Sequence, residues 1–252
     1  MINLNPNQKQ RYLRNIIIPQ IGEDGQKKLL AAKILVIGAG GLGSSVILYL
    51  AANGIGNITI VDDDVVEISN LQRQIIHNSC DLDKSKVKSA KAKVKLLNDD
   101  VNIEVLNLRI DRDNLSKIIN DFDCVIDCSD NFSTRFSINE VCFKNSQKLI
   151  FAAVKEFSGQ LSFFNFAKKN QPCYSCFNHN DDTKNSDLPL EQKGILGSIP
   201  GILGSMQATL AINHILGIGE DLAGKMIICD LSKFNFRKIS LSKNESCKIC
   251  ST

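Results

Sequence analysis

Four glycines around the start of one predicted helix carry the strongest chemical signal in the chain. They are Gly38, Gly40, Gly41 and Gly43, and they follow an apolar segment at residues 34–37. Glycines in such a turn let the backbone approach a phosphate, and the following helix offers free N–H groups to an anion. Asp62 lies roughly 20 residues further on, where an acid commonly holds a ribose hydroxyl. The spacing predicts a nucleotide site, although a glycine-rich turn that merely packs closely would look similar.

Polar residues beyond Asp62 indicate which nucleotide binds. Arg73 and Lys86 can neutralise a triphosphate, and Asp130 follows a later apolar segment, where it can hold Mg²⁺. Asn70 and Gln74 lie in the same stretch as Arg73. A dinucleotide carries less charge and needs no such cluster, so the set favours ATP with Mg²⁺. Taken singly, Arg73 and Lys86 could be solvated surface side chains, and Asp130 could be a helix N-cap. The glycines alone would also permit an NAD-dependent oxidoreductase.

Two cysteine pairs form a second signal. Cys173 and Cys176 are separated by two residues, as are Cys247 and Cys250 near the end of the chain. Each pair can supply two corners of a tetrahedral sulfur site, which suits a structural Zn²⁺ because no ligand position is left open. A redox Cys-x-x-Cys or unpaired surface thiols are the alternatives. The other cysteines mostly lie in apolar patterns typical of core residues.

Composition favours a cytoplasmic enzyme. The chain has 252 residues, of which 43% are hydrophobic and 23% charged, and disorder is therefore not expected. A net charge of +3 argues against a nucleic-acid partner, and no apolar run is long enough to span a membrane. The N-terminus has no apolar signal core, and nine cysteines without one fit a reducing compartment.

The pattern of apolar segments predicts an α/β fold. Strands and helices alternate up to residue 158, which favours a doubly wound, mostly parallel, Rossmann-like sheet. Right-handed crossovers would then bring the strand ends to one ligand-binding edge. Residues 159–252 look β-rich, with strands that can be antiparallel, and 178–192 form a long polar loop. We treat 1–252 as one domain with two halves. The predicted strands are 34–37, 58–61, 102–108, 124–128, 148–154, 160–166, 226–231 and 236–241, and the predicted helices are 42–53, 84–98, 112–120 and 132–146.

Taken together, these motifs resemble the ThiF/MoeB/HesA family of sulfur-carrier adenylyltransferases, which are related to ubiquitin-activating enzymes. The resemblance runs nearly end to end. It includes R-Y-L-R-N-I-I-I-P-Q-I-G at 11–22, G-A-G-G-L-G at 38–43, S-N-L-Q-R-Q at 69–74, D-C-S-D-N at 127–131, G-I-L-G-S-I-P-G at 194–201 and both cysteine pairs.

The resemblance implies roles for individual residues. Gly41 would approach the phosphates and Asp62 would hold the ribose. Asn70, Arg73 and Lys86 would contact the phosphates, and Asp130 would bind Mg²⁺. Arg14 is expected to reach into the site of a neighbouring protomer. Retention of these residues argues against a third possibility, a scaffold that has lost catalysis.

The resemblance also implies partners and a reaction. The implied partners are a second copy of the chain, in a homodimer, and a small β-grasp sulfur-carrier protein of the thiamine or molybdopterin pathway that ends in Gly-Gly. Its carboxylate would attack the α-phosphate of ATP to give an acyl-adenylate and pyrophosphate. A sulfurtransferase or cysteine desulfurase is a further partner implied, and a relative that adenylates a peptide is the alternative within the family.

One position departs from the family pattern. Many members carry a cysteine four residues before the glycine that is Gly194 here, and this chain has Leu190. A covalent carrier adduct needs a thiolate, so we expect the reaction to stop at the adenylate. Cys80 and Cys229 are the remaining candidates for a nucleophile.

Overall fold

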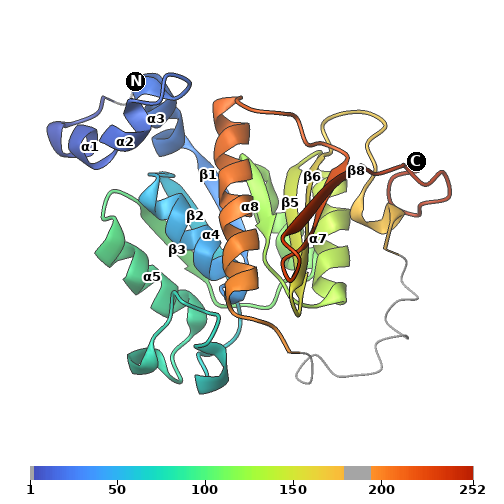
Figure 1. Cartoon of the computed structure of the whole chain (residues 1–252), viewed down its shortest axis with the longest axis horizontal. Helices are drawn as coiled ribbons and strands as arrows, with labels where there is room; N and C mark the ends of the chain where they lie inside the picture. The colour runs from blue at the N-terminus through green and yellow to red at the C-terminus, as the bar shows by residue number, and fades with distance from the viewer. Residues whose placement is uncertain (1–2, 179–193, 252) are drawn as a thin grey trace.

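The computed structural model describes residues 3–178 and 194–251, which form one mixed sheet flanked by helices (Figure 1). The sheet has eight strands in the order β3-β2-β1-β4-β5-β6-β7-β8. The strands are β1 Lys33–Ile37, β2 Asn57–Val61, β3 Asn102–Leu106, β4 Cys124–Asp127, β5 Lys148–Lys155, β6 Ser158–Asn165, β7 Lys225–Asp230 and β8 Asn235–Ser240. The α-helices are α1 Pro6–Arg11, α2 Leu13–Ile16, α3 Gly22–Ala31, α4 Gly41–Ala52, α5 Lys86–Leu97, α6 Arg112–Ile118, α7 Phe132–Lys144 and α8 Ser198–Leu216.

The first five strands pair in parallel, as predicted. β1 and β4 are neighbours although two strands separate them in the chain, so the chain reverses its direction of winding between them. In doubly wound sheets the crevice outside the carboxyl ends of the strands at this reversal is where ligands bind. The predicted strand 102–108 ends at Leu106, and helix 84–98 is one to two residues shorter at each end.

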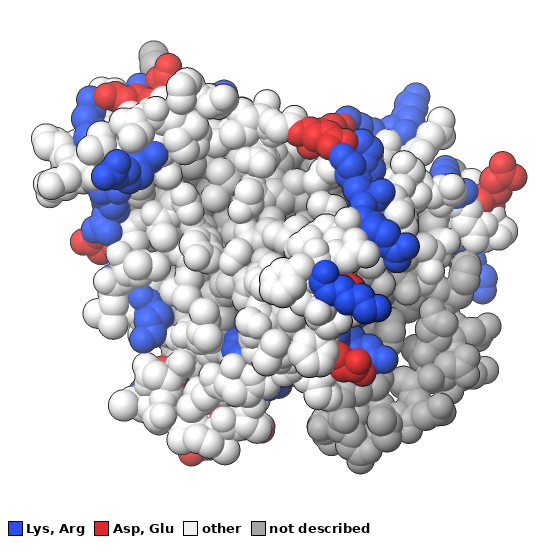
Figure 2. All heavy atoms as spheres, viewed as in Figure 1, with Lys and Arg blue, Asp and Glu red and all other residues white. Residues whose placement is uncertain are grey.

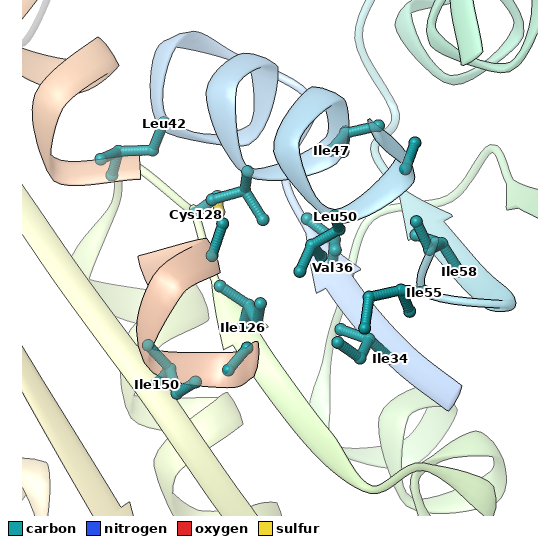
Figure 3. Packing of buried hydrophobic residues seen from close by; sticks show 14 of the residues in the cluster. Ile34, Val36, Leu42, Ile47, Leu50, Ile55, Ile58, Ile126, Cys128 and Ile150 are labelled. Atoms are coloured by element: carbon teal, nitrogen blue, oxygen red, sulfur yellow. The ribbon is translucent and has the colours of Figure 1, made fainter. Parts of the chain in front are cut away.

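Alternate residues of the central strands enter two separate cores. Ile34 and Val36 of β1 pack with α4 and α8, whereas Leu35 and Ile37 face the opposite side, toward α6 and α7. Figure 3 shows Ile34 and Val36 beneath Leu50 of α4 in the first core. A strand buried on both faces reads as a continuous apolar run, and this is why its period-2 alternation is absent from the sequence.

The second half adds three antiparallel strands to the same sheet, together with the longest helix. β6, β7 and β8 pair antiparallel in succession after β5, in agreement with the predicted strands. The prediction of a β-rich half was incomplete, because α8 spans 19 residues there. Pro200 and Gly204 suggest a loop, yet proline is tolerated in the first helical turn. Gly204 is required because a Cβ there would lie 2.1 Å from Ser45 Oγ on α4.

Three helices that the pattern did not predict precede β1. α1 begins with a capping box, in which Asn5 and Gln8 exchange side-chain and backbone hydrogen bonds. Tyr12, 2% exposed, ties this segment to the body, because its hydroxyl accepts a hydrogen bond from Asn98 Nδ2 at 2.9 Å. The predicted division between the two halves lies at the β5–β6 hairpin.

Two further predictions concern membrane spans and the long polar loop. Within residues 3–178 and 194–251, no helix is long and apolar enough to cross a membrane. The polar loop falls almost wholly on residues 179–193, and Leu190 with it, so both lie outside the part of the chain that the structure describes.

Candidate active site

A pocket of about 970 Å³ opens at the carboxyl ends of β1, β2 and β4. Its volume lies at the upper end of the range for small-molecule sites. It brings together nearly all the residues singled out for nucleotide binding, although they come from separate segments of the chain. Those that line it are Gly38, Gly40, Gly41, Asp62, Asn70, Arg73, Gln74, Lys86 and Asp130.

The glycines shape the floor of the pocket in two ways. Gly38 has φ +103, and Gly43 allows the turn to close, because a Cβ there would lie 2.0 Å from the Gly38 carbonyl oxygen. Gly43 is thus a packing residue and is not among those that line the pocket. Gly40 is the N-cap of α4 without a side-chain cap, so the first N–H groups of that helix are available to bind an anion. Among the described residues, a Cβ on Gly40 would meet only the Gln74 side chain, with Nε2 at 3.6 Å and Cδ at 3.9 Å, so its bare backbone leaves room for a ligand.

Asp62 directly follows β2, lines the pocket and braces the glycine turn. Its Oδ2 accepts a hydrogen bond from Ala39 N at 2.7 Å, and its Oδ1 accepts one from Asp64 N at 2.9 Å. Burial raises the pKa of the Asp62 carboxyl, and these hydrogen bonds and the Lys86 charge oppose the rise. Each oxygen keeps a further lone pair, so the carboxylate can also accept from a sugar hydroxyl.

The segment after β2 supplies the polar wall. Asn70 closes the short 3₁₀-helix η1 (Ile68–Asn70) and is buried, and the Arg73 Nη1 donates to the Ser69 carbonyl at 3.0 Å. That bond holds the guanidinium at the pocket, and its other donors make no hydrogen bond to the residues that the structure describes. Gln74 is 4% exposed, and its Oε1 is buried without a hydrogen-bond partner among the described residues. An unpaired buried oxygen in a pocket wall fits a ligand donor.

Lys86 starts α5 and is 6% exposed. Its Nζ lies 2.7 Å from Asp64 Oδ2. Together with Arg73 it is one of the cationic residues that line the pocket, the others being Arg109, Arg135 and Lys155. Asp62, Asp63 and Asp64 form a group of carboxylates close to one another just after β2. The sequence prediction considered only Asp62 of this group.

Asp130 follows β4 on the opposite wall. It is exposed, and within the described part of the chain its Oδ1 accepts only a long hydrogen bond, from Asn131 Nδ2 at 3.5 Å, so most of its lone pairs are available to a cation. The helix N-cap that was the alternative for Asp130 is in fact Asn131, whose side chain accepts from Thr134 N at 2.9 Å. Mg²⁺ is usually held by one or two carboxylates together with substrate phosphates, and the exposed Asp130 carboxylate can serve in that way.

Several supporting residues were missed from the sequence. Gln207 of α8 is fully buried and donates to the Asp127 carbonyl at 2.8 Å, which fixes the end of β4 before Asp130. Arg135 lines the pocket and donates to the Ser129 carbonyl at 2.9 Å, with its guanidinium over the Phe151 ring. The signal in the sequence was its place at the end of D-C-S-D-N-F-S-T-R, residues 127–135, five residues after Asp130.

His77 supports the glycine turn from behind. Its ring nitrogens lie 2.8 Å from Ser89 Oγ and 3.0 Å from the Ala39 carbonyl oxygen. Burial lowers the pKa of His77, and the nearby Lys86 charge lowers it further. The neutral ring can donate to Ala39 from Nε2 while Nδ1 accepts from Ser89.

Three predicted residues lie away from the pocket. Arg14, on α2, is exposed and is not among the lining residues of this chain. Cys80 is exposed and Cys229 is buried, and neither lines the pocket. Cys128 does line it, but burial raises the pKa of this thiol well above its ordinary value, so it is a poor nucleophile.

The four predicted cysteines meet at one buried point. Cys173 Sγ lies 3.6 Å from Cys247 Sγ and 4.0 Å from Cys176 Sγ, and Cys176 Sγ lies 3.3 Å from Cys250 Sγ. A tetrahedron with Zn–S bonds of about 2.3 Å places sulfur atoms ~3.8 Å apart, so the cluster has the size of a zinc site. Burial raises the pKa of Cys173 to about 12 without metal. The cluster fits zinc, and the ion itself stays a prediction.

Comparison with known proteins identifies relatives over the whole fold. The model of the ThiF family matches residues 12–249. The chain is 38% identical to the SAMP-activating enzyme E1 of Haloferax volcanii, over 99% of this chain and 91% of that protein. It is 35% identical to a sulfur carrier protein adenylyltransferase of Thermus thermophilus, over 95% and 90%. It is 39% identical to a molybdopterin-synthase adenylyltransferase of Haemophilus influenzae, over 97% and 99%.

Solved structures agree with the fold. The crystal structure of E. coli MccB with ATP superposes with a TM-score of 0.84 at 24% identity, and the match covers 98% of this chain and 75% of that one. A complex of MccB with a peptide, MccA-N7isoASN, gives the same TM-score at 23% identity and covers 99% and 76%.

Proposed function

Because the chain belongs to the ThiF family and is an adenylyltransferase, we propose that it adenylates the C-terminal Gly-Gly carboxylate of a small β-grasp sulfur-carrier protein. The observation that carries this proposal is one pocket that combines an uncapped helix N-terminus, the cations Arg73 and Lys86, and the exposed carboxylate of Asp130. The positive groups suit a triphosphate and the carboxylate suits its metal ion. The alternative, an NAD-dependent oxidoreductase, leaves Arg73 and Lys86 without a use.

In the proposed reaction the carboxylate oxygen of the carrier attacks the α-phosphorus. The bond from that phosphorus to the bridging oxygen breaks, and pyrophosphate leaves with the electron pair. No general base is needed, because a carboxylate is already ionised. Catalysis therefore consists of positioning and charge neutralisation. Arg73 and Lys86 would bind the phosphates, Asp62 the ribose, and Asp130 would hold the Mg²⁺ that neutralises the leaving group.

The second half of the chain would receive the carrier. β8 is an edge of the sheet, paired only with β7 among the described strands, and Phe234 and Phe236 are 81% and 49% exposed. Figure 2 shows Lys and Arg side chains gathered over the region of β8. An open edge strand with apolar and basic side chains suits a β-rich partner with an acidic surface.

A homodimer is part of the proposal. On the face seen in Figure 2, the surface over α8 carries few charges. Ile202 on α8 and Tyr49 on α4 are 38% and 53% exposed, and Leu13 on α2 is 50% exposed. Interface cores are depleted of charge and enriched in such residues. Arg14 lies beside Leu13, so a partner protomer on this face would receive it.

Exchange between ATP and labelled pyrophosphate tests the function. We expect exchange with a carrier that ends in Gly-Gly, drawn from the thiamine or molybdopterin pathway, and none when the two glycines are deleted. The same exchange measured with a short peptide in place of the carrier tests the alternative that the protein adenylates a peptide. Exchange that needs neither carrier nor peptide, or binding of NAD in preference to ATP with Mg²⁺, would contradict the proposal.

A further inference from the structure

The two side chains of the Lys86–Asp64 ion pair differ strongly in exposure, which suggests that Lys86 can exchange Asp64 for another anion. The Lys86 side chain is 7% exposed and cannot move far, whereas the Asp64 side chain is 63% exposed. Among the described residues, Asp64 is the carboxylate in contact with the Lys86 ammonium, at 2.7 Å. The cation is therefore fixed, while its exposed counter-ion can turn into water once another anion pairs with the ammonium.

The backbone holds both residues in a rigid frame. Lys86 N donates to the Asp64 carbonyl at 3.0 Å, and Val66 N donates to the Lys84 carbonyl at 2.9 Å. An isolated antiparallel bridge joins Val65 to Ser85 between them. This short ribbon fastens the start of α5 to the end of β2. The Asp64 side chain is the movable part, because its backbone N–H is also bound, to Asp62 Oδ1 at 2.9 Å.

We infer that Asp64 is a positioning residue, a placeholder that pairs with Lys86 until a polyphosphate displaces it. This inference rests on the proposed function, in which Lys86 binds phosphate. The carboxylate keeps the buried ammonium paired and aimed at the pocket in the nucleotide-free protein. A bound polyphosphate has to compete with Asp64 for the same ammonium, and it also experiences repulsion from the carboxylate. Asp64 therefore lowers affinity for anions and favours ligands with several phosphates over single ones.

The test is equilibrium binding of inorganic pyrophosphate to the full chain by calorimetry, in buffer without Mg²⁺. Asp64→Asn keeps the shape and a hydrogen-bond acceptor but removes the charge. We expect it to bind pyrophosphate roughly 3- to 10-fold more tightly than the wild type, the scale of one partly exposed charge pair. In carrier-dependent exchange the same variant should lower the KM for pyrophosphate without raising kcat. A purely structural role would not produce that split.

Two variants make the result specific. Asp63→Asn removes the same charge from the neighbouring exposed residue, for which the described part of the chain shows no ion pair, and it should give a smaller gain. In the double variant Asp64→Asn with Lys86→Gln, the gain should disappear, because it requires the ammonium. Unchanged or weaker binding by Asp64→Asn would overturn the inference while the proposed function stands. No pyrophosphate binding by either the wild-type chain or Asp64→Asn would also overturn the inference, and carrier-dependent exchange then tests the proposed function separately.

Discussion

At the scale of single residues, the pocket separates groups that bind from groups that hold the binders in place. Asp130 has an available carboxylate and no strong internal hydrogen bond, whereas Asp127, three residues earlier, is buried and accepts hydrogen bonds from the Ser129 N–H and hydroxyl at 2.9 and 2.6 Å. Burial raises the pKa of Asp127 despite the attraction of Arg135. The two acids on one turn therefore have different tasks.

Asp130→Ala is expected to lower carrier-dependent exchange roughly 100-fold or more, the scale lost when one electrostatic group is removed from an active site. The chain should still fold, because the Asp130 side chain is exposed. Circular dichroism and the thermal midpoint serve as the control for folding. Full exchange activity in this variant would remove Asp130 from the proposed metal site.

His77 gives a second residue-scale prediction, in pH dependence. Burial holds its pKa below the ordinary value of about 6.5, so the unfolded chain binds the proton more readily than the folded one. Its contribution to stability is therefore present above about pH 6.5 and is lost as pH falls from there toward the lower pKa of the folded state.

The measurement is the free energy of unfolding at about pH 7.5 and about pH 5.5. The wild type should lose more stability across this interval than His77→Gln, which cannot take up the proton. An equal loss in both proteins would show that the histidine titrates alike in the folded and unfolded chains. Because the neutral His77 ring holds the Ala39 carbonyl in the glycine turn, its protonation should also weaken ATP affinity over the same interval.

At the scale of elements, the crossing of α4 and α8 sets the position of the glycine turn. Gly204 sits where the helices meet, with Leu42 O 2.4 Å from the place of a Cβ, and Ser45 Oγ donates to the Pro200 carbonyl at 3.3 Å. A side chain there must push α4 away. The helix that presents its N-terminus to the pocket would move with it.

Gly204→Ala is therefore expected to lower the free energy of unfolding by about 1–3 kcal/mol and to weaken ATP binding. Gly201→Ala, one turn earlier, is the matched control, because nothing lies within 4 Å of a Cβ there. It should raise stability by about 0.5–1 kcal/mol, since alanine favours a helix. The free energies come from urea denaturation. Equal effects of the two substitutions would contradict a close crossing.

The elements also show where prediction from sequence succeeded and failed. The strands around Val36 and Ile126 were predictable, because buried parallel strands have strong apolar runs bounded by turns. α8 was not predicted, because Gly204 is read as a helix breaker until its neighbour Ser45 is known. The glycines, Asp62 and Lys86 follow local patterns. Gln207 and His77 act through contacts distant in sequence, and no local pattern reveals them.

At the scale of the whole molecule, the cysteine cluster fastens the C-terminal segment to the body of the fold. Cys247 and Cys250 meet Cys173 and Cys176, which follow β6, in the core on the α6–α7 side of the sheet. Closing so long a loop with a metal ion restricts the unfolded chain. None of the four cysteines is among the described residues that line the pocket, so loss of the ion should affect stability before chemistry.

Purified protein is expected to contain about one Zn²⁺ per chain, measured by elemental analysis. Cys247→Ser should lower the thermal midpoint more than it lowers the exchange rate at low temperature. Because the Cys173 thiol has a raised pKa without metal, zinc uptake should release protons and tighten as pH rises. Four freely titratable thiols in metal-free, fully stable protein would rule the site out.

We propose that this pocket joins a carrier carboxylate to AMP and that the reaction stops at this adenylate. The most direct measurement is the intact mass of a Gly-Gly carrier after incubation with the protein, ATP and Mg²⁺, with a non-reducing gel of the same sample. We predict a carrier heavier by one adenylyl group, no gain with the Gly-Gly deleted, and no thiol-sensitive enzyme–carrier adduct. An unmodified carrier in the presence of bound ATP, or a carrier attached to Cys80 or Cys229, would contradict it.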